Sequence, residues 1–307
     1  MKILVTGGAG FIGRHLVKAL IEERHHVVVF DNLSNSSEKL LRSVSGEFSF
    51  VKGDITNYDQ ISSVVSGVDL VIHLAAMISV NDSVTHPEKT IRINVGGTEN
   101  LLRACVANHV KNFIATSSAA VYGDLQTPEI SLDEKSKTNS ISPYGKSKLE
   151  MENLIKQFSI ENDLNTIILR LFNIYGMGQS SEYAGIISKF SENIRNQEAL
   201  VIYGDGLQTR DFVSVVDVVD SIKLVMTKIF EKRGAIYNIA SGKSITIHGL
   251  AKLMLSISGI TLEIRNVEPK KGDVRYSNAS IELAKSQLGY EPKIILEVGI
   301  KNLLGIK

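Results

Sequence analysis

The feature that most constrains the fold is a glycine-rich turn near the start of the chain, Gly7-x-x-Gly10-x-x-Gly13. An apolar run at residues 3–5 precedes it and a helical pattern follows at once, so we predict a strand, a tight turn and the start of a helix. The three glycines suit a turn, close approach of a ligand to the backbone, and close packing of the helix on the strand. The free N–H groups of the helix N-terminus would attract an anion there.

A second apolar run, residues 26–30, ends in Asp31. At about this distance from its glycine turn, a dinucleotide-binding βαβ unit places the carboxylate that binds an adenosine ribose hydroxyl. The turn and Asp31 together therefore predict a dinucleotide cofactor. Since an acidic side chain repels a 2′-phosphate, we expect NAD rather than NADP.

Three more apolar runs, at residues 48–51, 70–73 and 112–116, alternate with helical patterns. The run at 70–73 is nearly all apolar, as in a parallel strand that is buried on both faces. This alternation predicts an α/β fold with a doubly wound parallel sheet of the Rossmann type. Ligands of such sheets bind at the carboxyl ends of the strands.

Residues that follow these strands are the candidate cofactor contacts. Asp54 would serve as a helix cap, as an adenine contact, or as both, and the small residues after the run at 70–73 leave room for a ligand. Asn94 lies inside a long helical pattern, residues 87–108, where an amide is unfavourable unless it is used in a buried hydrogen bond; a surface Asn is the alternative. The expected contacts are Gly7, Gly10, Phe11, Ile12, Gly13, Asp31, Asn32, Asn35, Ser36, Asp54, Ile55, Leu74, Ala75, Ala76 and Asn94.

A hydroxyl, a phenol and an ammonium group are the candidate catalytic groups. The run at 112–116 delivers Ser118 to the carboxyl edge of the sheet, and Pro143 marks the start of a helix that carries Tyr144 and Lys148. Because side chains four residues apart share one helical face, the ammonium group can stand beside the phenol and lower its pKa.

The regular alternation of strands and helices stops near Asn173, and the composition then becomes more irregular. We expect a Rossmann domain at residues 1–173, to which later segments near residues 210–240 return. A smaller C-terminal substrate-binding domain is expected at residues 174–307.

Taken in order, these motifs resemble those of the extended short-chain dehydrogenase/reductase superfamily. Within it, the chain is similar to the NAD-dependent epimerase/dehydratase family and to nucleotide-sugar 4-epimerases of the UDP-glucose 4-epimerase type. The motifs that carry the resemblance are residues 6–13, Ser118, Tyr144, Lys148, Phe172-Asn173 and residues 208–212. The resemblance covers almost the whole chain.

The resemblance implies an isomerase that works through a transient 4-keto sugar. Tyr144 would be the general base for the sugar 4-hydroxyl, and Ser118 would bind the reacting oxygen. Lys148 would lower the pKa of Tyr144 and bind the nicotinamide ribose, so Tyr144 and Lys148 also count as cofactor contacts. Ala119-Ala120 stands where related dehydratases and decarboxylases carry carboxylates, which favours epimerisation.

The resemblance also implies a set of substrate contacts. Asn173 and Arg210 match positions that bind the diphosphate, although Arg210 could instead pair with Asp211. Tyr203 would border the base. Relatives often carry an Arg shortly before the segment matching Gly272-Asp273. Here Lys270 and Lys271 stand instead, so these lysines or Arg275 would complete the diphosphate clamp.

Ser277 matches a position that borders the C2 substituent of the sugar, where a small residue leaves space for an N-acetyl group. The expected substrate contacts are Ser118, Tyr144, Asn173, Tyr203, Arg210, Arg275 and Ser277. A shift of one residue would instead place Tyr276 in the pocket. The expected substrates are UDP-glucose and UDP-galactose types, with or without the N-acetyl group.

Two other readings of function stay open. The first is another NAD-dependent nucleotide-sugar enzyme, such as a uronic-acid 4-epimerase, a decarboxylase or an oxidoreductase. The second is a non-catalytic NAD-binding protein with the same fold, since a fold alone does not determine function.

The composition of the chain limits the kinds of partner that it is expected to bind. The net charge of +1 and the lack of a basic stripe give no support to a nucleic-acid partner. No apolar run is long enough to span a bilayer, and the single Cys105 allows no disulfide within the chain, so we expect a cytoplasmic protein. We expect no metal, and His73 should be packed at a strand end. The helical segments 87–108 and 145–160 carry apolar residues on more than one face, as expected for a homodimer.

Overall fold

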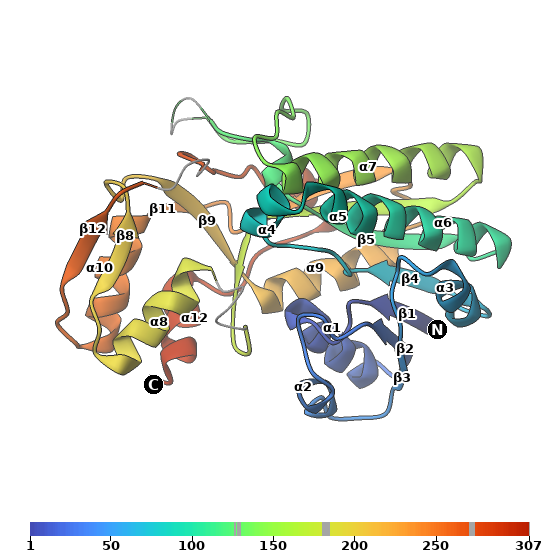
Figure 1. Cartoon of the computed structure of the whole chain (residues 1–307), viewed down its shortest axis with the longest axis horizontal. Helices are drawn as coiled ribbons and strands as arrows, with labels where there is room; N and C mark the ends of the chain where they lie inside the picture. The colour runs from blue at the N-terminus through green and yellow to red at the C-terminus, as the bar shows by residue number, and fades with distance from the viewer. Residues whose placement is uncertain (126, 128–129, 180–184, 270–273, 307) are drawn as a thin grey trace. The chain divides into compact units, whose positions relative to one another are not determined.

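A seven-stranded sheet with the order β10-β6-β5-β4-β1-β2-β3 forms the centre of the fold (Figure 1). The computed structural model describes the chain except residues 126, 128–129, 180–184, 270–273 and 307. The strands of this sheet are β1 (Lys2–Thr6), β2 (His26–Asp31), β3 (Ser49–Lys52), β4 (Leu70–His73), β5 (Asn112–Ser118), β6 (Asn165–Leu171) and β10 (Ala235–Ile239).

Parallel pairing runs from β3 through β2, β1 and β4 to β5. Strand β1 lies between β2 and β4, with Leu4 opposite Val28 on one side and Val71 on the other. The order of the strands therefore reverses beside β1, and the glycine turn follows β1 directly at its carboxyl end. In open α/β sheets, ligands bind at this kind of reversal point.

Helices cover both faces of this sheet, which confirms the expected doubly wound architecture. Helices α6 (Gly97–Ala107) and α7 (Pro143–Glu161) lie over one face, and α1 (Phe11–Glu22) lies over the other (Figure 1). The remaining helices of this part are α2 (Glu38–Arg42), α3 (Tyr58–Val65), α4 (Val80–Thr85), α5 (Pro87–Ile91) and the 3-10 turn η2 (Ala119–Val121). Apolar side chains of β4, β5, α6 and α7 share one buried core, which includes Val71, Leu101, Phe113 and Ile155.

The single long helix expected at residues 87–108 is not continuous. Helix α5 ends at Ile91, a π-turn, η1 (Arg92–Gly96), follows, and α6 begins at Gly97. Asn94 lies inside this π-turn and is 1% exposed. Such turns insert a residue into the helix and often mark functional sites, and the apolar spacing of a sequence does not reveal them.

The C-terminal part has its own sheets and core. Strands β7 (Asn173–Tyr175), β9 (Thr209–Ser214) and β11 (Ser244–Thr246) form one sheet, and β8 (Leu200–Tyr203) pairs in parallel with β12 (Ile264–Val267). The helices here are α8 (Ile186–Asn196), α10 (Ile247–Ser258), α11 (Glu282–Leu288) and α12 (Leu296–Leu304). The apolar core of this part includes Phe190, Leu250 and Ile300.

Contacts divide the chain into two compact units. The first comprises residues 1–121, 142–170 and 219–237, and the second comprises residues 122–141, 171–218 and 238–307. Helix α9 (Val215–Lys228) begins in the second unit and ends in the first. Residues 122–141, which we expected in the first domain, cluster with the second unit, because Leu132 bonds Asn278 and Ser280 through its backbone.

Candidate active site

The glycine turn brings two strand ends into close contact. Gly7 has a φ of +70°, which favours glycine, and a β-carbon there would lie 2.6 Å from the backbone nitrogen of Ala75. The Gly10 N–H donates to the Gly7 carbonyl at 3.0 Å. Helix α1 then begins with no side-chain cap and no acidic residue in its first turn. Its N-terminal N–H groups thus face an edge that suits an anion.

Asp31 ends β2 and turns its carboxylate toward the glycine turn. One oxygen accepts from the Ala9 N–H at 3.0 Å and the other from the Leu33 N–H at 2.8 Å. Burial raises the pKa of Asp31, and the two backbone N–H groups oppose that rise. Ser36 donates to the Ala9 carbonyl, so the loop after β2 is also bound to the turn.

The structure corrects one expected role of Asp54. The N-cap of α3 is Asn57, whose side chain accepts from the Gln60 N–H, so Asp54 does not cap this helix. The Asp54 carboxylate instead accepts from the Thr56 N–H and from the Asn32 amide, at 2.8 and 2.9 Å. This contact joins two of the expected cofactor residues at the ends of β2 and β3.

The other expected cofactor residues lie around the same edge. Leu74 follows β4 and its N–H donates to the Thr6 carbonyl, and Ala75 and Ala76 come next. Phe11 and Ile12 are half-buried in the first turn of α1, and Asn35 is exposed. Ile55 is different, because its side chain belongs to the hydrophobic core and packs on Gly97.

Asn94 confirms the buried role predicted for its amide. Its oxygen accepts from the Met77 N–H at 2.8 Å, and its nitrogen donates to the Met77 carbonyl and to the Ser147 hydroxyl at 3.1 and 2.9 Å. The Ser147 hydroxyl in turn donates to the Tyr144 carbonyl at 2.7 Å. The π-turn thus binds both the loop after β4 and the first turn of α7.

His73 is packed at the end of β4, as predicted, and its contacts determine its tautomer. The Thr98 hydroxyl donates to the Asn94 carbonyl at 2.6 Å, so it accepts from His73 Nε2–H at 2.9 Å. His73 Nδ1 is then the acceptor for the Thr6 hydroxyl at 2.7 Å. Burial, and the nearby charge of Lys148, lower the pKa of His73 to about 3, so the ring is neutral.

Ser118, Tyr144 and Lys148 come together at the carboxyl end of β5 and the start of α7. The Tyr144 phenol is hydrogen-bonded to Ser118, and the Lys148 ammonium group donates to the Thr116 carbonyl at 2.9 Å. Ser142 caps α7 by accepting from the Gly145 N–H, and the Ser83 hydroxyl accepts from the Tyr144 N–H. Tyr144 and Lys148 are both buried.

The expected lowering of the Tyr144 pKa by Lys148 is not what the structure shows. Burial raises the pKa of Tyr144, and the group that opposes this rise is Ser118. Lys148 shares a helical face with Tyr144 but directs its ammonium group to the Thr116 carbonyl. Burial lowers the pKa of Lys148 to about 8, while the charge of Glu152 acts to raise it.

Glu152 is a buried charge that sequence reasoning missed. It lies one turn beyond Lys148 on α7, and Arg170 of β6 donates to its two oxygens at 2.9 and 2.7 Å. The two side chains are 0% and 4% exposed. Its signal in the sequence is the spacing of four residues from Lys148, which puts it on the same helical face.

Except for Ser118 and Tyr144, which belong to the first unit, the expected substrate residues lie in the second unit. Asn173 donates from its amide to the Asp211 carbonyl, and Arg210 donates to the Thr209 carbonyl at 2.7 Å. The alternative pairing of Arg210 with Asp211 does not occur. One Asp211 oxygen accepts from Ser241 at 2.7 Å, and the other has no hydrogen-bond partner among the described residues.

The remaining substrate candidates are near β8 and β9. Arg275 donates to both carboxylate oxygens of Asp205, at 2.6 and 2.8 Å. Ser277 is buried, and its N–H donates to the Thr209 hydroxyl at 3.4 Å. Tyr203 ends β8 and is 39% exposed. Lys270 and Lys271 lie outside the described residues.

Comparison with known proteins identifies the family. Residues 3–240 match the model of the NAD dependent epimerase/dehydratase family. The chain belongs to this family.

Relatives of this epimerase-family chain match it over almost its whole length. It is 35% identical over 305 residues to a putative UDP-glucose 4-epimerase of Methanocaldococcus jannaschii, covering 98% of this chain and 97% of the relative. It is 30% identical over 342 residues to dTDP-L-rhamnose 4-epimerase of Burkholderia thailandensis, covering 98% and 93%.

Solved structures show the same fold with different activities. UDP-glucose 4-epimerase of Thermotoga maritima with UDP-glucose is 36% identical, with a TM-score of 0.93 and coverage of 99% and 98%. The dTDP-glucose 4,6-dehydratase DesIV of Streptomyces venezuelae with NAD is 29% identical, with a TM-score of 0.92 and coverage of 99% and 96%.

NAD is the cofactor of this family, and the residues at the edge of the sheet fit it. The uncapped start of α1 suits a pyrophosphate, and a side chain at Gly7 would block the approach of the loop after β4. The Asp31 carboxylate suits a ribose hydroxyl. Among the described residues, no group of His, Cys, Asp and Glu could hold a metal ion, and no helix is long and apolar enough to cross a bilayer.

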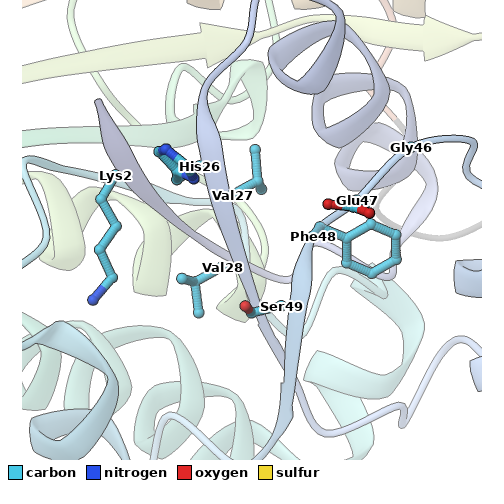
Figure 2. A pocket seen from close by; sticks show the side chains of 8 residues that line it. All are labelled: Lys2, His26, Val27, Val28, Gly46, Glu47, Phe48 and Ser49. Atoms are coloured by element: carbon cyan, nitrogen blue, oxygen red, sulfur yellow. The ribbon is translucent and has the colours of Figure 1, made fainter.

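A hollow lies at the opposite edge of the sheet from the candidate site (Figure 2). Lys2, His26 and Ser49 are the first residues of β1, β2 and β3, so this hollow is at the amino ends of the strands. Its lining residues are Lys2, His26, Val27, Val28, Gly46, Glu47, Phe48 and Ser49. None of the expected site residues lines it, and we assign it no role.

The buried Glu152–Arg170 pair predicts a large effect on stability. Replacing Glu152 by Gln removes the anion and leaves the Arg170 charge buried without its counter-ion, so the free energy of unfolding should fall by about 3–5 kcal/mol. Urea denaturation measures this. Glu150→Gln, on the exposed face of the same helix, is the matched control and should change it little. Equal effects of the two substitutions on the free energy of unfolding would contradict a stabilising role of the buried Glu152–Arg170 ion pair.

Proposed function

We propose that the chain is a nucleotide-sugar 4-epimerase that acts on UDP-glucose and UDP-galactose types of substrate. The observation that carries the proposal is the set of Ser118, Tyr144 and Lys148 at the carboxyl edge of the sheet, of which Tyr144 and Lys148 are buried and Ser118 is half-buried. Ala119 and Ala120 follow Ser118, so no carboxylate stands there for the removal of water. The epimerases among its relatives also support the proposal.

The proposed roles follow from the chemistry of each side chain. Bound NAD supplies the acceptor and donor of hydride. Tyr144 takes the proton of the sugar 4-hydroxyl and later returns it, and Ser118 holds the same oxygen by a hydrogen bond. Lys148 remains mostly charged below pH 8, and we assign its ammonium group, which the Thr116 carbonyl orients, to the nicotinamide ribose.

On the substrate side, we assign Asn173 and Arg210 to the diphosphate and Tyr203 to the base. Arg275 is the described candidate to complete the diphosphate clamp, because its guanidinium forms the bidentate contacts that a phosphate also accepts. These residues lie in the second unit, which we propose is the substrate-binding domain.

Incubation with a panel of nucleotide sugars tests the reaction class. Epimerisation leaves the mass of the sugar nucleotide unchanged and produces a second isomer, which chromatography separates. A loss of 18 or 44 mass units would indicate a dehydratase or a decarboxylase instead. If no sugar nucleotide of the panel is converted to a product, a non-catalytic NAD-binding protein is favoured.

Tyr144→Phe should remove most turnover while the fold and NAD binding remain. The substitution deletes only the phenolic oxygen, and general acid–base groups typically contribute about 10² to 10⁴ in rate. The measurements are kcat with the active sugar nucleotide and NAD affinity by titration. Full activity in this variant would exclude the proposed mechanism.

We also propose that Ser277 leaves room for an N-acetyl group at C2 of the sugar. Ser277→Tyr should then reduce kcat/KM for the acetylated substrate far more than for the plain one, because the ring would fill that space. Tyr276→Phe, which alters the neighbouring residue with little change in size, is the control. An unchanged ratio of the two kcat/KM values in Ser277→Tyr would show that this residue does not gate the C2 substituent.

We propose that two copies pair through the helical segments of residues 87–108 and 145–160 to form a cytoplasmic homodimer. Ile91 and Ile160 are 45% and 82% exposed on these segments, which supports an apolar contact. Light scattering at micromolar concentration should give twice the chain mass of 33.6 kDa. A mass of one chain under these conditions would count against the dimer.

A further inference from the structure

The Lys148 ammonium group is buried and touches no carboxylate. The residue is 3% exposed, and its ammonium group donates to the Thr116 carbonyl at 2.9 Å and contacts the Met151 sulfur at 3.7 Å. Among the described residues, Lys148 forms no ion pair. A buried ammonium group is costly unless an anion compensates its charge. An anion that does not touch Lys148 is therefore needed.

The groups around Lys148 leave one buried anion for this role. The His73 ring is neutral, and burial raises the pKa of the Tyr144 phenol and that of the Cys105 thiol of α6, so none of the three is charged at neutral pH. Glu152 is 0% exposed, lies on the same helical face as Lys148, and acts to raise its pKa. The charged side chains of the helices packed on α7 are exposed or half-exposed, so water screens them: Asp82, Glu88, Lys89, Arg92, Glu99 and Arg103.

Arg170 of β6 determines what the Glu152 carboxylate can bind. It donates to both Glu152 oxygens, at 2.9 and 2.7 Å, and its side chain is 4% exposed. A Lys and a Glu four residues apart on a helix are close enough to pair directly. Here the carboxylate binds Arg170 instead, so the hydrogens of the Lys148 ammonium group are left for the Thr116 carbonyl and for a ligand.

We propose that Glu152 is a remote counter-ion that keeps Lys148 charged, and that Arg170 keeps this carboxylate from pairing with Lys148 directly. Both are positioning residues, because they act on the cofactor only through Lys148. The role rests on the proposed function, which assigns the Lys148 ammonium group to the nicotinamide ribose. Without Glu152 the ammonium group would lose its charge too readily, and without Arg170 it would be drawn away from the Thr116 carbonyl.

The titration of Lys148 itself tests the proposal. Lysine labelled with carbon-13 lets NMR follow each lysine side chain in the full chain saturated with NAD, and Lys148→Met identifies the Lys148 signal by its loss. The variants to compare with the wild type are Glu152→Gln, Arg170→Met and the double variant that combines them. Glu150→Gln, on the exposed face of the same helix, is the matched control.

The two single variants should shift Lys148 in opposite directions. In Glu152→Gln the titration midpoint of Lys148 should move about one pH unit or more to lower pH, because the nearby anion is gone. In Arg170→Met it should move to higher pH, because the freed carboxylate pairs with Lys148. Glu150→Gln should leave it unchanged. A pair that only stabilised the fold would not produce opposite shifts.

Two further variants keep the test decisive if a single variant does not fold. The double variant leaves no buried charge of the pair, and uncharged residues of similar volume often replace a buried ion pair without loss of stability. Its Lys148 midpoint should lie below that of the wild type. Arg170→Lys keeps the charge but cannot bind both oxygens as the guanidinium does, so it should raise the midpoint as Arg170→Met does.

Binding of NADH reports the consequence for the cofactor. The chain has no Trp, so the fluorescence of the reduced nicotinamide reports binding directly. Arg170→Met should bind NADH about tenfold more weakly at every pH, since a hydrogen bond to a charged group contributes about this factor. Glu152→Gln should lose affinity only as the pH rises through its lowered midpoint.

None of these measurements needs a nucleotide sugar. If no sugar were epimerised, the proposed reaction would fail while the Lys148 titration would still be decided. Three results would overturn the proposal: an unchanged Lys148 midpoint in folded Glu152→Gln or in the double variant, a midpoint that does not rise in folded Arg170→Met or Arg170→Lys, and full NADH affinity in folded Arg170→Met.

Discussion

One neutral histidine holds the edge of the sheet on which the candidate site is built. His73 binds Thr6, the last residue of β1, and Thr98, which follows the π-turn. A charged ring would carry a proton on both nitrogens, and the Thr6 hydroxyl would then lose its acceptor. Burial lowers the pKa of His73 to about 3, so this arrangement holds at neutral pH.

The same chain of polar contacts continues to the catalytic helix. Thr98 binds the carbonyl of Asn94, the amide of Asn94 binds Ser147, and Ser147 binds the carbonyl of Tyr144. The residue before the glycine turn and the proposed general base are thus joined by buried hydrogen bonds within one unit. Cofactor and phenol need a fixed relative position for proton and hydride transfer, and rigid supports of this kind supply it.

Much of the fold and of the candidate site could be predicted from local sequence signals. The expected strands agree with the observed ones to within two residues, because apolar runs flanked by glycine and polar residues specify buried parallel strands. The glycine turn and Asp31 likewise indicate their own contact, and the spacing of Tyr144 and Lys148 indicates a shared helical face. The π-turn at Asn94 was not predicted, since one inserted residue leaves the apolar spacing almost unchanged. The direction of the Lys148 side chain depends on the Thr116 carbonyl of another segment, which no local pattern encodes.

An ion pair in the second unit orients the proposed diphosphate-binding Arg275. Arg275 is bound by the Asp205 carboxylate, and its backbone N–H donates to Asp124. The ion pair is partly exposed, so solvent weakens it and its exchange for another anion costs little. A diphosphate offers the same paired oxygens as the carboxylate, with more charge. Under the proposed function, Asp205 therefore keeps the Arg275 fork oriented until a substrate diphosphate takes its place.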